Sequence, residues 1–208
     1  MSDIRILIVE DEPLIAEDIA TTLVQADYSI SGIAYSKEDA LNELVNNQPD
    51  MVLLDINLNG GIEGIEIGEY LKAKYQVPFV YLTSYADKQT LDKAKQTEPS
   101  GYIIKPFSEA SLFSTIEIAL YNYAQKTKSS YPDLSMEKIN RHLTTPFSQR
   151  EFEVLQLIYE GITNQQIGEQ LFISINTIKK HINNAYLKMG SETRSAAIAK
   201  LRELMLKK

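Results

Sequence analysis

The 208-residue chain contains no cysteine, and its apolar runs are no longer than single strands. The absence of cysteine excludes disulfide bonds, thiolate metal sites and a cysteine nucleophile, and it fits a reducing cytoplasm. The short apolar runs predict no membrane span, and the first residues lack the basic and apolar segments of a signal peptide. The chain also has no internal repeat or low-complexity tract. At this length we expect one large or two ordinary globular domains.

Charge is divided unevenly along the chain, whose formal net charge is −7. Residues 1–143 contain 12 Lys and Arg against 22 Asp and Glu, whereas residues 144–208 contain 9 against 6. Only the C-terminal part therefore has the positive excess that favours binding to nucleic acid. An excess of this size is also common on solvated surfaces, so it supports a DNA-binding motif without establishing one.

The first part of the chain alternates between short apolar runs and helical patterns. The apolar runs span residues 4–9, 30–34, 51–54, 78–82 and 101–104. The helical patterns span residues 13–24, 36–47, 64–74, 87–97 and 108–126. Strict alternation of this kind predicts an α/β fold, a doubly wound five-stranded parallel sheet of the flavodoxin-like type.

Four of the predicted strands deliver polar residues at their ends: Glu10 and Asp11, Asp55, Thr83, and Lys105. Ligands bind at the carboxyl ends of strands in open α/β sheets, so these side chains should meet at one edge. The carboxylates suit Mg²⁺, Asp55 can attack phosphorus, and Thr83 and Lys105 can hold phosphoryl oxygens. Taken singly, the acidic residues could merely cap a helix, and the others are ordinary turn or surface residues. Their combination at four strand ends favours a phosphoryl-transfer site.

Residues 1–125 resemble the receiver domain of two-component response regulators. The matching motifs are LIVEDEP at residues 7–13, VLLD at 52–55, VPFVYLT at 77–83 and GYIIKP at 101–106. The resemblance implies that Asp55 accepts a phosphoryl group from a sensor histidine kinase. It also implies a Mg²⁺ site formed by carboxylates and one backbone carbonyl. Its ligands would be Glu10, Asp11, Asp55 and the carbonyl of Asn57.

The same resemblance assigns roles to three further residues of the predicted site. Thr83 and Tyr102 are expected to change conformation on phosphorylation, although Tyr102 could equally be a half-buried strand aromatic. A cis peptide before Pro106 is expected to direct Lys105 into the pocket. Tyr85, two residues after Thr83, could shield the acyl phosphate from water.

One loop departs from the receiver pattern. Receivers usually carry Pro four residues and Gly eight residues after the acceptor, but this chain has Asn59 and Glu63 there, with Gly64 one residue late. We infer a loop that is longer by one residue and loosened by the pair Gly60–Gly61. The set of site side chains is intact, while the backbone beside the metal site is expected to differ.

The C-terminal part contains four helical patterns, over residues 148–160, 164–171, 175–189 and 194–206. They follow a polar stretch, residues 126–145, which we expect to be a linker with room for a short helix near residues 134–139. A short helix, a tight turn and a longer helix are the parts of a helix-turn-helix motif. The sequence therefore predicts an all-α, four-helix DNA-binding domain after the α/β domain.

The third of these helices has two contrasting faces at about 100° per residue. Its narrow apolar face comprises Ile178, Ile182, Ala185 and Met189. Its opposite face comprises Asn176, Lys179, Lys180 and Asn183. Lys can donate to guanine and Asn can pair with adenine, so the polar face suits a major groove. A merely solvated face is the usual alternative, and the preceding short helix and turn make it a poorer interpretation here.

Residues 146–208 resemble the LuxR-type (NarL/FixJ) helix-turn-helix domain, which lacks a wing. The matching motifs are FSQRE at residues 147–151, GITN at 161–164, LFIS at 171–174, NTIKKH at 176–181 and KMG at 188–190. The resemblance implies base or groove contacts from Lys179, Lys180 and Asn183, with Thr177 and His181 nearer to phosphates. His181 could instead be a packing residue. The family commonly dimerises through the last helix, which would use Ala196, Ala197, Leu201 and Leu204.

We therefore predict a phosphorylation-controlled, DNA-binding transcriptional regulator and not an enzyme, with a receiver at residues 1–125, a linker at 126–145 and a helix-turn-helix domain at 146–208. The expected cofactor is Mg²⁺. The expected partners are a sensor histidine kinase, double-stranded DNA and, once phosphorylated, a second copy of the chain, all in the cytoplasm and not at a membrane. The alternative is a receiver that acts through protein contacts or as a phosphate sink, against which Lys179 and Lys180 argue.

Overall fold

The computed structural model describes residues 3–75, 77–84 and 88–207. Tyr85, a candidate shield for the acyl phosphate, lies outside these residues. The chain forms two compact units, one of residues 5–120 and one that combines residues 3–4 with residues 121–207. Within the described residues, no helix combines the length and the apolar composition that crossing a membrane requires.

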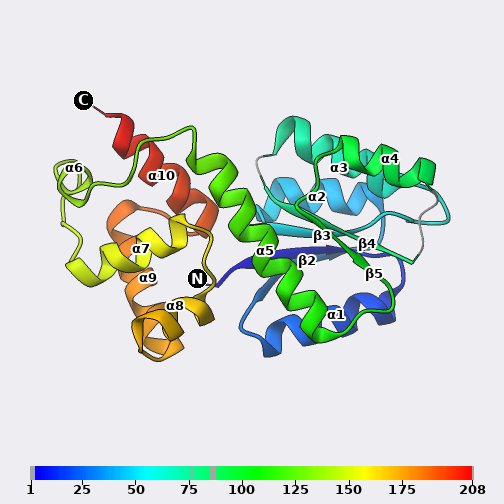
Figure 1. The fold of residues 1–208 in the computed structure, drawn as a ribbon, viewed down its shortest axis with the longest axis horizontal. Helices are drawn as coiled ribbons and strands as arrows, with labels where there is room; N and C mark the ends of the chain where they lie inside the picture. The colour runs from blue at the N-terminus through cyan, green and yellow to red at the C-terminus, as the bar shows by residue number, and fades with distance from the viewer. Residues whose placement is uncertain (1–2, 76, 85–87, 208) are drawn as a thin grey trace. The chain divides into compact units, whose positions relative to one another are not determined.

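The first unit is a five-stranded parallel sheet covered by helices on both faces (Figure 1). Its strands are β1 (Arg5–Val9), β2 (Ser29–Ala34), β3 (Met51–Asp55), β4 (Phe79–Thr83) and β5 (Gly101–Ile104). Its helices are α1 (Pro13–Gln25), α2 (Lys37–Asn47), α3 (Glu63–Lys74), α4 (Lys88–Gln96) and the first part of α5 (Glu109–Lys128). The predicted doubly wound α/β fold is confirmed.

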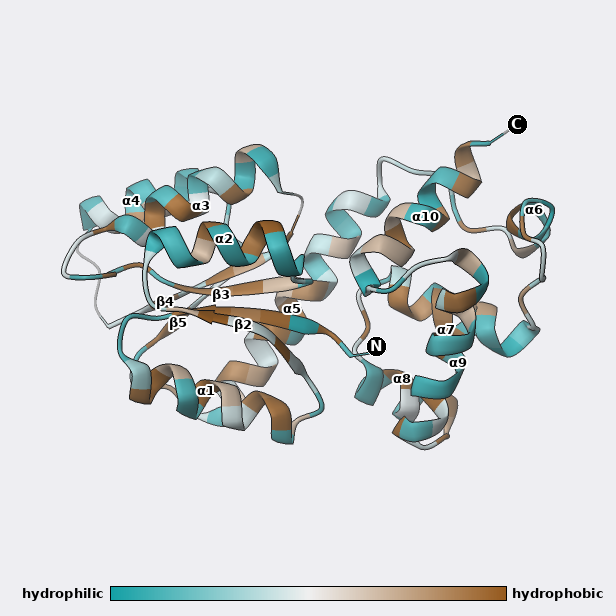
Figure 2. Ribbon diagram, turned by 180° about the vertical axis from the view of Figure 1, so that it is seen from behind, coloured by the Kyte–Doolittle hydropathy of each residue, from teal (hydrophilic) through white to brown (hydrophobic). Residues whose placement is uncertain are grey.

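Burial explains the composition of the strands. Every residue of β3 and β4 is buried, as expected for central strands of a parallel sheet with helices on both faces. The edge strands β2 and β5 are only partly buried. In Figure 2 the strands are accordingly the most hydrophobic part of this unit. The apolar runs in the sequence therefore correspond to the strands of the sheet.

Strand order places the predicted site residues at one edge. The order is β2-β1-β3-β4-β5. From β1 the chain first adds β2 on one side and then adds β3, β4 and β5 on the other, so the strand order switches direction at β1 and β3. In the parallel register Val9 lies opposite Leu54, Asp55 opposite Leu82 and Thr83 opposite Ile104. The carboxyl ends of β1, β3, β4 and β5 are thus level, at the switch point where open α/β sheets bind ligands.

The second unit is helical and contains the last residues of α5. Its other helices are α6 (Met136–Asn140), α7 (Gln149–Tyr159), α8 (Asn164–Leu171), α9 (Ile175–Met189) and α10 (Arg194–Leu206). Side chains of Ser148, Thr163, Ser174 and Thr193 each accept a hydrogen bond from the backbone at the start of α7, α8, α9 and α10. Such N-caps satisfy backbone donors that the helix leaves unpaired. They explain why each helix begins where it does.

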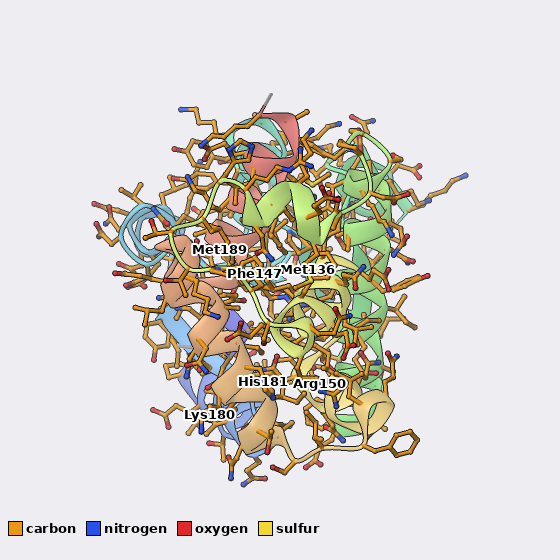
Figure 3. All side chains as sticks on the ribbon, turned by 90° about the vertical axis from the view of Figure 1, so that its left-hand side faces the viewer. Met136, Phe147, Arg150, Lys180, His181 and Met189 are labelled. Atoms are coloured by element: carbon orange, nitrogen blue, oxygen red, sulfur yellow. The ribbon has the colours of Figure 1, made fainter. Side chains whose placement is uncertain are left out.

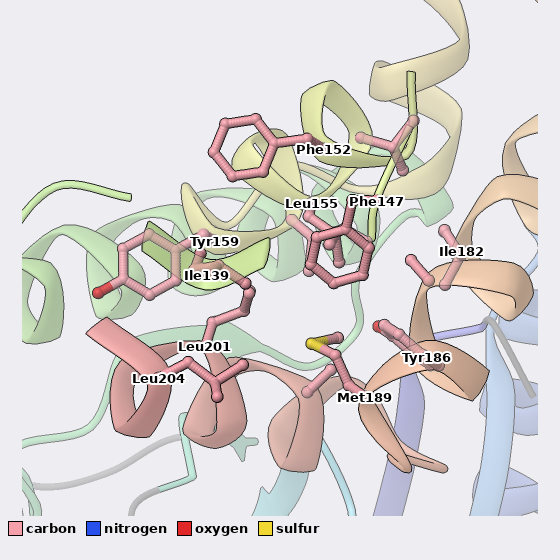
Figure 4. Close-up of a cluster of buried hydrophobic side chains, with 14 of the residues drawn as sticks. Ile139, Phe147, Phe152, Leu155, Tyr159, Ile182, Tyr186, Met189, Leu201 and Leu204 are labelled. Atoms are coloured by element: carbon pink, nitrogen blue, oxygen red, sulfur yellow. The ribbon is translucent and has the colours of Figure 1, made fainter. Parts of the chain in front are cut away.

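The core of the second unit joins all five of its own helices (Figure 4). The apolar face predicted for α9 lies in it, since Ile178, Ile182 and Ala185 are fully buried and Met189 is nearly so. Phe147, just before α7, packs among them. The amphipathic pattern of α9 was therefore sufficient to identify its buried side.

The stretch of residues 126–145 differs from a simple linker. Helix α5 continues to Lys128, and α6 forms close to the short helix expected near residues 134–139. Ile139 on α6 is 0% exposed and belongs to the core of the second unit. The backbone N–H of Ser135 donates to Met205 Sδ (3.4 Å), and Lys138 Nζ donates to the Met205 carbonyl (2.5 Å). Part of the polar stretch is therefore packed against α10.

This packing corrects the expected dimerisation face of the last helix. Ala197, Leu201 and Leu204 are buried within the unit and form part of its core, and only Ala196 is exposed. An apolar stripe on a helix shows that something covers it, but not what does so. In this conformation the covering residues come from the chain itself, so the stripe is not available for pairing.

The turn between α8 and α9 is strained at Phe172. This residue caps the C-terminus of α8 in a left-handed conformation (φ 54°), and its side chain is 94% exposed. The left-handed region costs an ordinary residue about 1–2 kcal/mol, and Asn tolerates it better. We expect Phe172→Asn to raise the free energy of unfolding by about 1 kcal/mol, measured by urea unfolding of the whole chain.

Gly190, the left-handed cap of α9 (φ 66°), provides the matched control. A Cβ at this position would meet no atom within 4 Å, so Gly190→Ala tests the backbone alone. It should lower the free energy of unfolding by about 1 kcal/mol. A loss of stability in Phe172→Asn would show that the ring of Phe172 packs in the folded chain.

Candidate functional site

Three carboxylates meet at the carboxyl edge of the sheet. Glu10 and Asp11 directly follow β1, and Asp55 is the last residue of β3. One carboxylate oxygen from each lies within 4.8 Å of the others, and Glu10 and Asp55 are buried. Oε1 of Glu10 is buried and has no hydrogen-bond partner within the described residues. The arrangement offers hard oxygen ligands of the kind that Mg²⁺ prefers.

Lys105 crosses this cluster from the end of β5. Its Nζ lies 2.5 Å from Glu10 Oε2 and 2.5 Å from Asp55 Oδ2. The peptide bond between Lys105 and Pro106 is cis, as the receiver resemblance implied. One ammonium group therefore bridges the carboxylate that follows β1 and the carboxylate that ends β3.

Burial and pairing both affect the protonation of the site. Burial raises the pKa of Glu10, and its hydrogen bond from Lys105 opposes that rise only in part. Burial lowers the pKa of the Lys105 ammonium, but its bonds to Asp55 and Glu10 outweigh burial and the net pKa is raised. A charged ammonium therefore contacts the carboxyl groups of Glu10 and Asp55, and Asp11 adds a third carboxylate to the cluster. The excess of buried acidic groups favours a divalent cation, whose charge would hold Glu10 ionised.

Backbone donors of the following loop hold two of the carboxylates. The N–H of Asn57 donates to Asp55 Oδ1 (2.8 Å), and the N–H of Asn59 donates to Asp11 Oδ2 (2.9 Å). Asn59 has φ 51°. Proline can supply neither that φ angle nor an N–H donor. A proline at position 59 would therefore lose this hydrogen bond and could not adopt this backbone conformation.

Gly64 fixes where α3 meets β3. A Cβ at this position would lie 1.9 Å from the Asp55 carbonyl oxygen, closer than any real contact. The N–H of Gly64 donates to the carbonyl of Ile56 (3.2 Å). The helix therefore needs glycine at this point, because its backbone touches the backbone of Asp55.

Thr83 and Tyr102 each carry a buried hydroxyl that has no partner within the described residues. Thr83 ends β4 and is 3% exposed. Burial raises the pKa of Tyr102, so its phenol is neutral. Unpaired buried hydroxyls are costly, and they commonly mark a site where a ligand or a second conformation supplies the partner.

Tyr81 is a neighbour of this site that the sequence motifs did not single out. It pairs with Tyr102 across β4 and β5, and the two ring centroids are 5.7 Å apart. Its hydroxyl shares a 3.0 Å hydrogen bond with Thr97 Oγ1, just after α4. Burial raises the pKa of Tyr81 to about 12. Aligning the ends of β4 and β5 in parallel register would have predicted the contact with Tyr102.

The predicted DNA-contacting residues lie on α9. Asn176, Thr177, Lys180 and Asn183 are exposed, whereas Lys179 and His181 are half-buried. Lys180 and His181 project from this helix in Figure 3. Lys179 Nζ forms an ion pair with Asp3 Oδ1 (3.0 Å), a residue of the same unit. The exposed stripe thus begins at Asn176 and carries one cation, Lys180, at its centre.

Close packing of α8 against the following turn supports a helix-turn-helix geometry. A Cβ on Gly168 would lie 3.0 Å from the carbonyl oxygen of Ile173, and the N–H of Ile173 donates to the Gly168 carbonyl (3.1 Å). The side chain of Ser174 then caps α9. A short helix, a tight turn and a longer helix with a polar outer face are the elements by which such motifs enter a major groove.

Two curated relatives match nearly the whole chain, and a solved receiver domain matches part of it. The transcriptional regulatory protein LiaR of Bacillus subtilis (strain 168) is 29% identical over 200 residues, which cover 93% of this chain and 94% of LiaR. The response regulator protein VraR of Staphylococcus saprophyticus is 27% identical over 198 residues, which cover 94% of each chain. The signal receiver domain of a modulated diguanylate cyclase from Desulfovibrio desulfuricans G20 is 32% identical, with a TM-score of 0.55, and covers 59% of this chain and 97% of its own.

Two family models match the chain. The response regulator receiver domain matches residues 6–117, more than half of the chain, and the luxR family of bacterial regulatory proteins matches residues 145–201. Of the relatives that match over nearly the whole length, LiaR is a transcriptional regulatory protein and VraR a response regulator protein. The chain therefore belongs to the response regulators, as a phosphorylation-dependent transcriptional regulator that joins a receiver domain to a LuxR-family DNA-binding domain.

Proposed function

We propose that Asp55 is the residue that accepts the phosphoryl group from a sensor histidine kinase. The observation that carries this assignment is the ammonium of Lys105, 2.5 Å from both Asp55 and Glu10, together with the buried hydroxyl of Thr83 at the end of β4, which is unpaired within the described residues. In the reaction a carboxylate oxygen of Asp55 forms a bond to phosphorus while the bond from phosphorus to the donor breaks. Lys105 and Thr83 would then face the phosphoryl oxygens.

The acidic cluster fits the Mg²⁺ that receiver domains use. We assign its ligands to the carboxylates of Glu10, Asp11 and Asp55 and to the carbonyl of Asn57. The support is the mutual approach of three carboxylates and the unpaired Oε1 of Glu10. When bound, the ion supplies positive charge that offsets repulsion between an incoming phosphoryl group and the acidic pocket.

We assign the conformational response to Thr83 and Tyr102. A phosphoryl oxygen on Asp55 would give the hydroxyl of Thr83 the partner that it lacks within the described residues. A shift of Thr83 toward that oxygen would change the space beside Tyr102, whose hydroxyl also lacks a partner there. Tyr81, whose ring contacts that of Tyr102 and whose hydroxyl is hydrogen-bonded to Thr97, connects such a change to the end of α4.

We propose that the exposed stripe of α9 reads double-stranded DNA in the major groove. Lys180 and Asn183 would contact base edges, with Lys179 beside them and with Thr177 and His181 nearer to phosphates. We propose that the phosphorylated chain acts as a homodimer on two half-sites in the cytoplasm, where both a kinase and DNA are accessible. A receiver that acts without specific DNA binding is less favoured, because Asn176, Lys180 and Asn183 on α9 are exposed.

Substitution of Lys180 tests base readout. Lys180→Ala should weaken binding to a selected operator by about 1–3 kcal/mol and relax the sequence preference at one position. A phosphate contact would instead weaken all sequences alike and reduce the slope of the logarithm of affinity against the logarithm of salt by about one unit. Titration of the whole chain against operator and scrambled duplexes, at several salt concentrations, separates the two.

Lys200 on α10 is the matched control, because it is a lysine paired only with Glu203 within the described residues and lies outside the predicted interface. Lys200→Ala should leave affinity unchanged. Lys179→Ala should also weaken DNA binding, but by less than Lys180→Ala. The effect is smaller because Lys179 must give up its ion pair with Asp3 to contact DNA. Unchanged affinity in both α9 variants would show that α9 is not the recognition helix.

A further inference from the structure

Helix α5 links the two compact units through an uninterrupted stretch of backbone hydrogen bonds. It spans 20 residues, Glu109–Lys128, and its residues from Tyr121 onward belong to the second unit. A helix transmits displacement along its axis better than a flexible tether, because its backbone is hydrogen-bonded throughout. Whether a change in the receiver reaches the DNA-binding unit then depends on how the last turns of α5 are held.

Arg202 on α10 holds these turns. Its Nη2 donates to Thr127 Oγ1 at 2.7 Å, and Thr127 Oγ1 itself donates to the Tyr123 carbonyl at 2.9 Å. The guanidinium carbon lies 4.6 Å from the centroid of the Tyr131 ring and 5.6 Å from that of the Tyr159 ring. One side chain therefore contacts the end of α5, the residues that follow it and α7.

The chemistry of this contact requires arginine. A planar guanidinium can donate from its edge to Thr127 while its face lies over tyrosine rings, whereas a lysine ammonium has no such plane. Cation–π contacts contribute about 0.5–1 kcal/mol where exposed and about 2 kcal/mol where desolvated. Arg202 and Tyr131 are half-buried and Tyr159 is buried, so screening by water is limited.

A second, weaker contact lies beside the first. Gln125 Nε2 donates to the carbonyl of Glu160 (3.3 Å), and Lys128 Nζ lies 3.4 Å from the carboxylate of Glu160. Glu160 caps the end of α7. Partly exposed ion pairs of this length contribute little, so they align the helix end but do not replace the contact with Arg202.

We propose that Arg202 is the positioning residue that fixes the C-terminal end of α5 to α7 and α10. Through this contact, a conformational change in the receiver on phosphorylation alters the DNA affinity of the second unit. This inference rests on the phosphorylation-controlled DNA binding proposed above. Without Arg202, the last turns of α5 and the residues after them become flexible relative to α7 and α10. Phosphorylation of the receiver then no longer changes the DNA affinity of the second unit.

The test is the ratio of DNA dissociation constants for the unphosphorylated and phosphorylated forms of the same full-length variant. A selected operator serves as the DNA probe, and acetyl phosphate with Mg²⁺ serves as the phosphodonor. A uniform loss of DNA contact or stability cancels in this ratio. Arg202→Ala should reduce the ratio by about fivefold or more, the lower end of typical allosteric coupling.

Four further variants sharpen the result. Arg202→Lys keeps the charge but loses the planar contact, so it should not restore the ratio, and Tyr131→Phe keeps the ring and should preserve it. Thr127→Val removes the acceptor without touching α10 and should lower the ratio, which keeps the test decisive if Arg202→Ala folds poorly. Lys200→Ala, on the same helix, should match the wild type.

The outcomes separate this inference from the proposed function. A ratio in Arg202→Ala and Thr127→Val within twofold of wild type, with equal labelling of Asp55, would overturn the role of Arg202 alone. A wild-type ratio of one, at full labelling, would overturn both the proposed control of DNA binding and this inference. A selective fall of the ratio in these variants supports it.

Discussion

We expect the Asp55→Asn chain to take up no phosphoryl group from acetyl phosphate in Mg²⁺, and its DNA affinity to be unaffected by the donor. The carboxamide lacks the nucleophilic oxygen, whereas its shape can still accept the hydrogen bond that Asn57 donates to Asp55 Oδ1. The fold should therefore persist although the reaction does not. Intact-protein mass spectrometry detects the adduct, and circular dichroism checks the fold.

Asp39 supplies the control for this substitution. It lies in the first turn of α2, away from the acidic cluster, so Asp39→Asn should be labelled like the wild type. A chelator of divalent cations should suppress labelling of the wild type, because the pocket would then repel an anionic donor. Labelling of Asp55→Asn at the wild-type rate and extent would place the acceptor elsewhere.

A fragment of residues 121–208 is expected to be more stable than a fragment of residues 144–208 by about 3 kcal/mol or more, the cost of removing a large buried side chain and its neighbours. The shorter fragment contains the helix-turn-helix domain that the sequence motifs predict, residues 146–208. It lacks Ile139, which is 0% exposed, and the contacts of Arg202 with Thr127 and Tyr131. Urea unfolding followed by circular dichroism measures both fragments.

The substitution Ile139→Ala within the longer fragment isolates one part of this difference. It should cost about 2–5 kcal/mol, the range for truncating a fully buried aliphatic side chain. Equal stability of the two fragments would mean that residues 121–143 do not belong to the folded unit. The longer fragment is thus the appropriate reagent for DNA binding in isolation from the receiver.

The fold of the first unit could be predicted because each of its strands is a separate apolar run. The candidate site could be predicted for a topological reason, since parallel strands present their carboxyl ends at one edge. That rule brings Lys105 to Glu10 and Asp55 without any knowledge of distances. It does not predict that Lys105 bridges both carboxylates, which depends on side-chain conformations.

The remaining features depend on contacts between distant residues. The sequence predicts an apolar stripe on α10, but whether Leu201 and Leu204 face another copy or Ile139 depends on how the chain folds back. Likewise, the polar composition of residues 126–145 conceals the few apolar side chains that anchor α6. Tyr81 is absent from the motifs because its importance lies in its contacts with Tyr102 and Thr97.

The close approach of Gly64 to Asp55 determines where this protein can tolerate changes in chain length. Because the start of α3 is pinned to the carbonyl of Asp55, an insertion cannot shift the helix along the strand. Changes in loop length must instead fall before Gly64, where Asn59, Gly60 and Gly61 are all exposed. Engineered insertions should therefore be placed among these three residues, whose main constraint is the N–H of Asn59 that Asp11 requires.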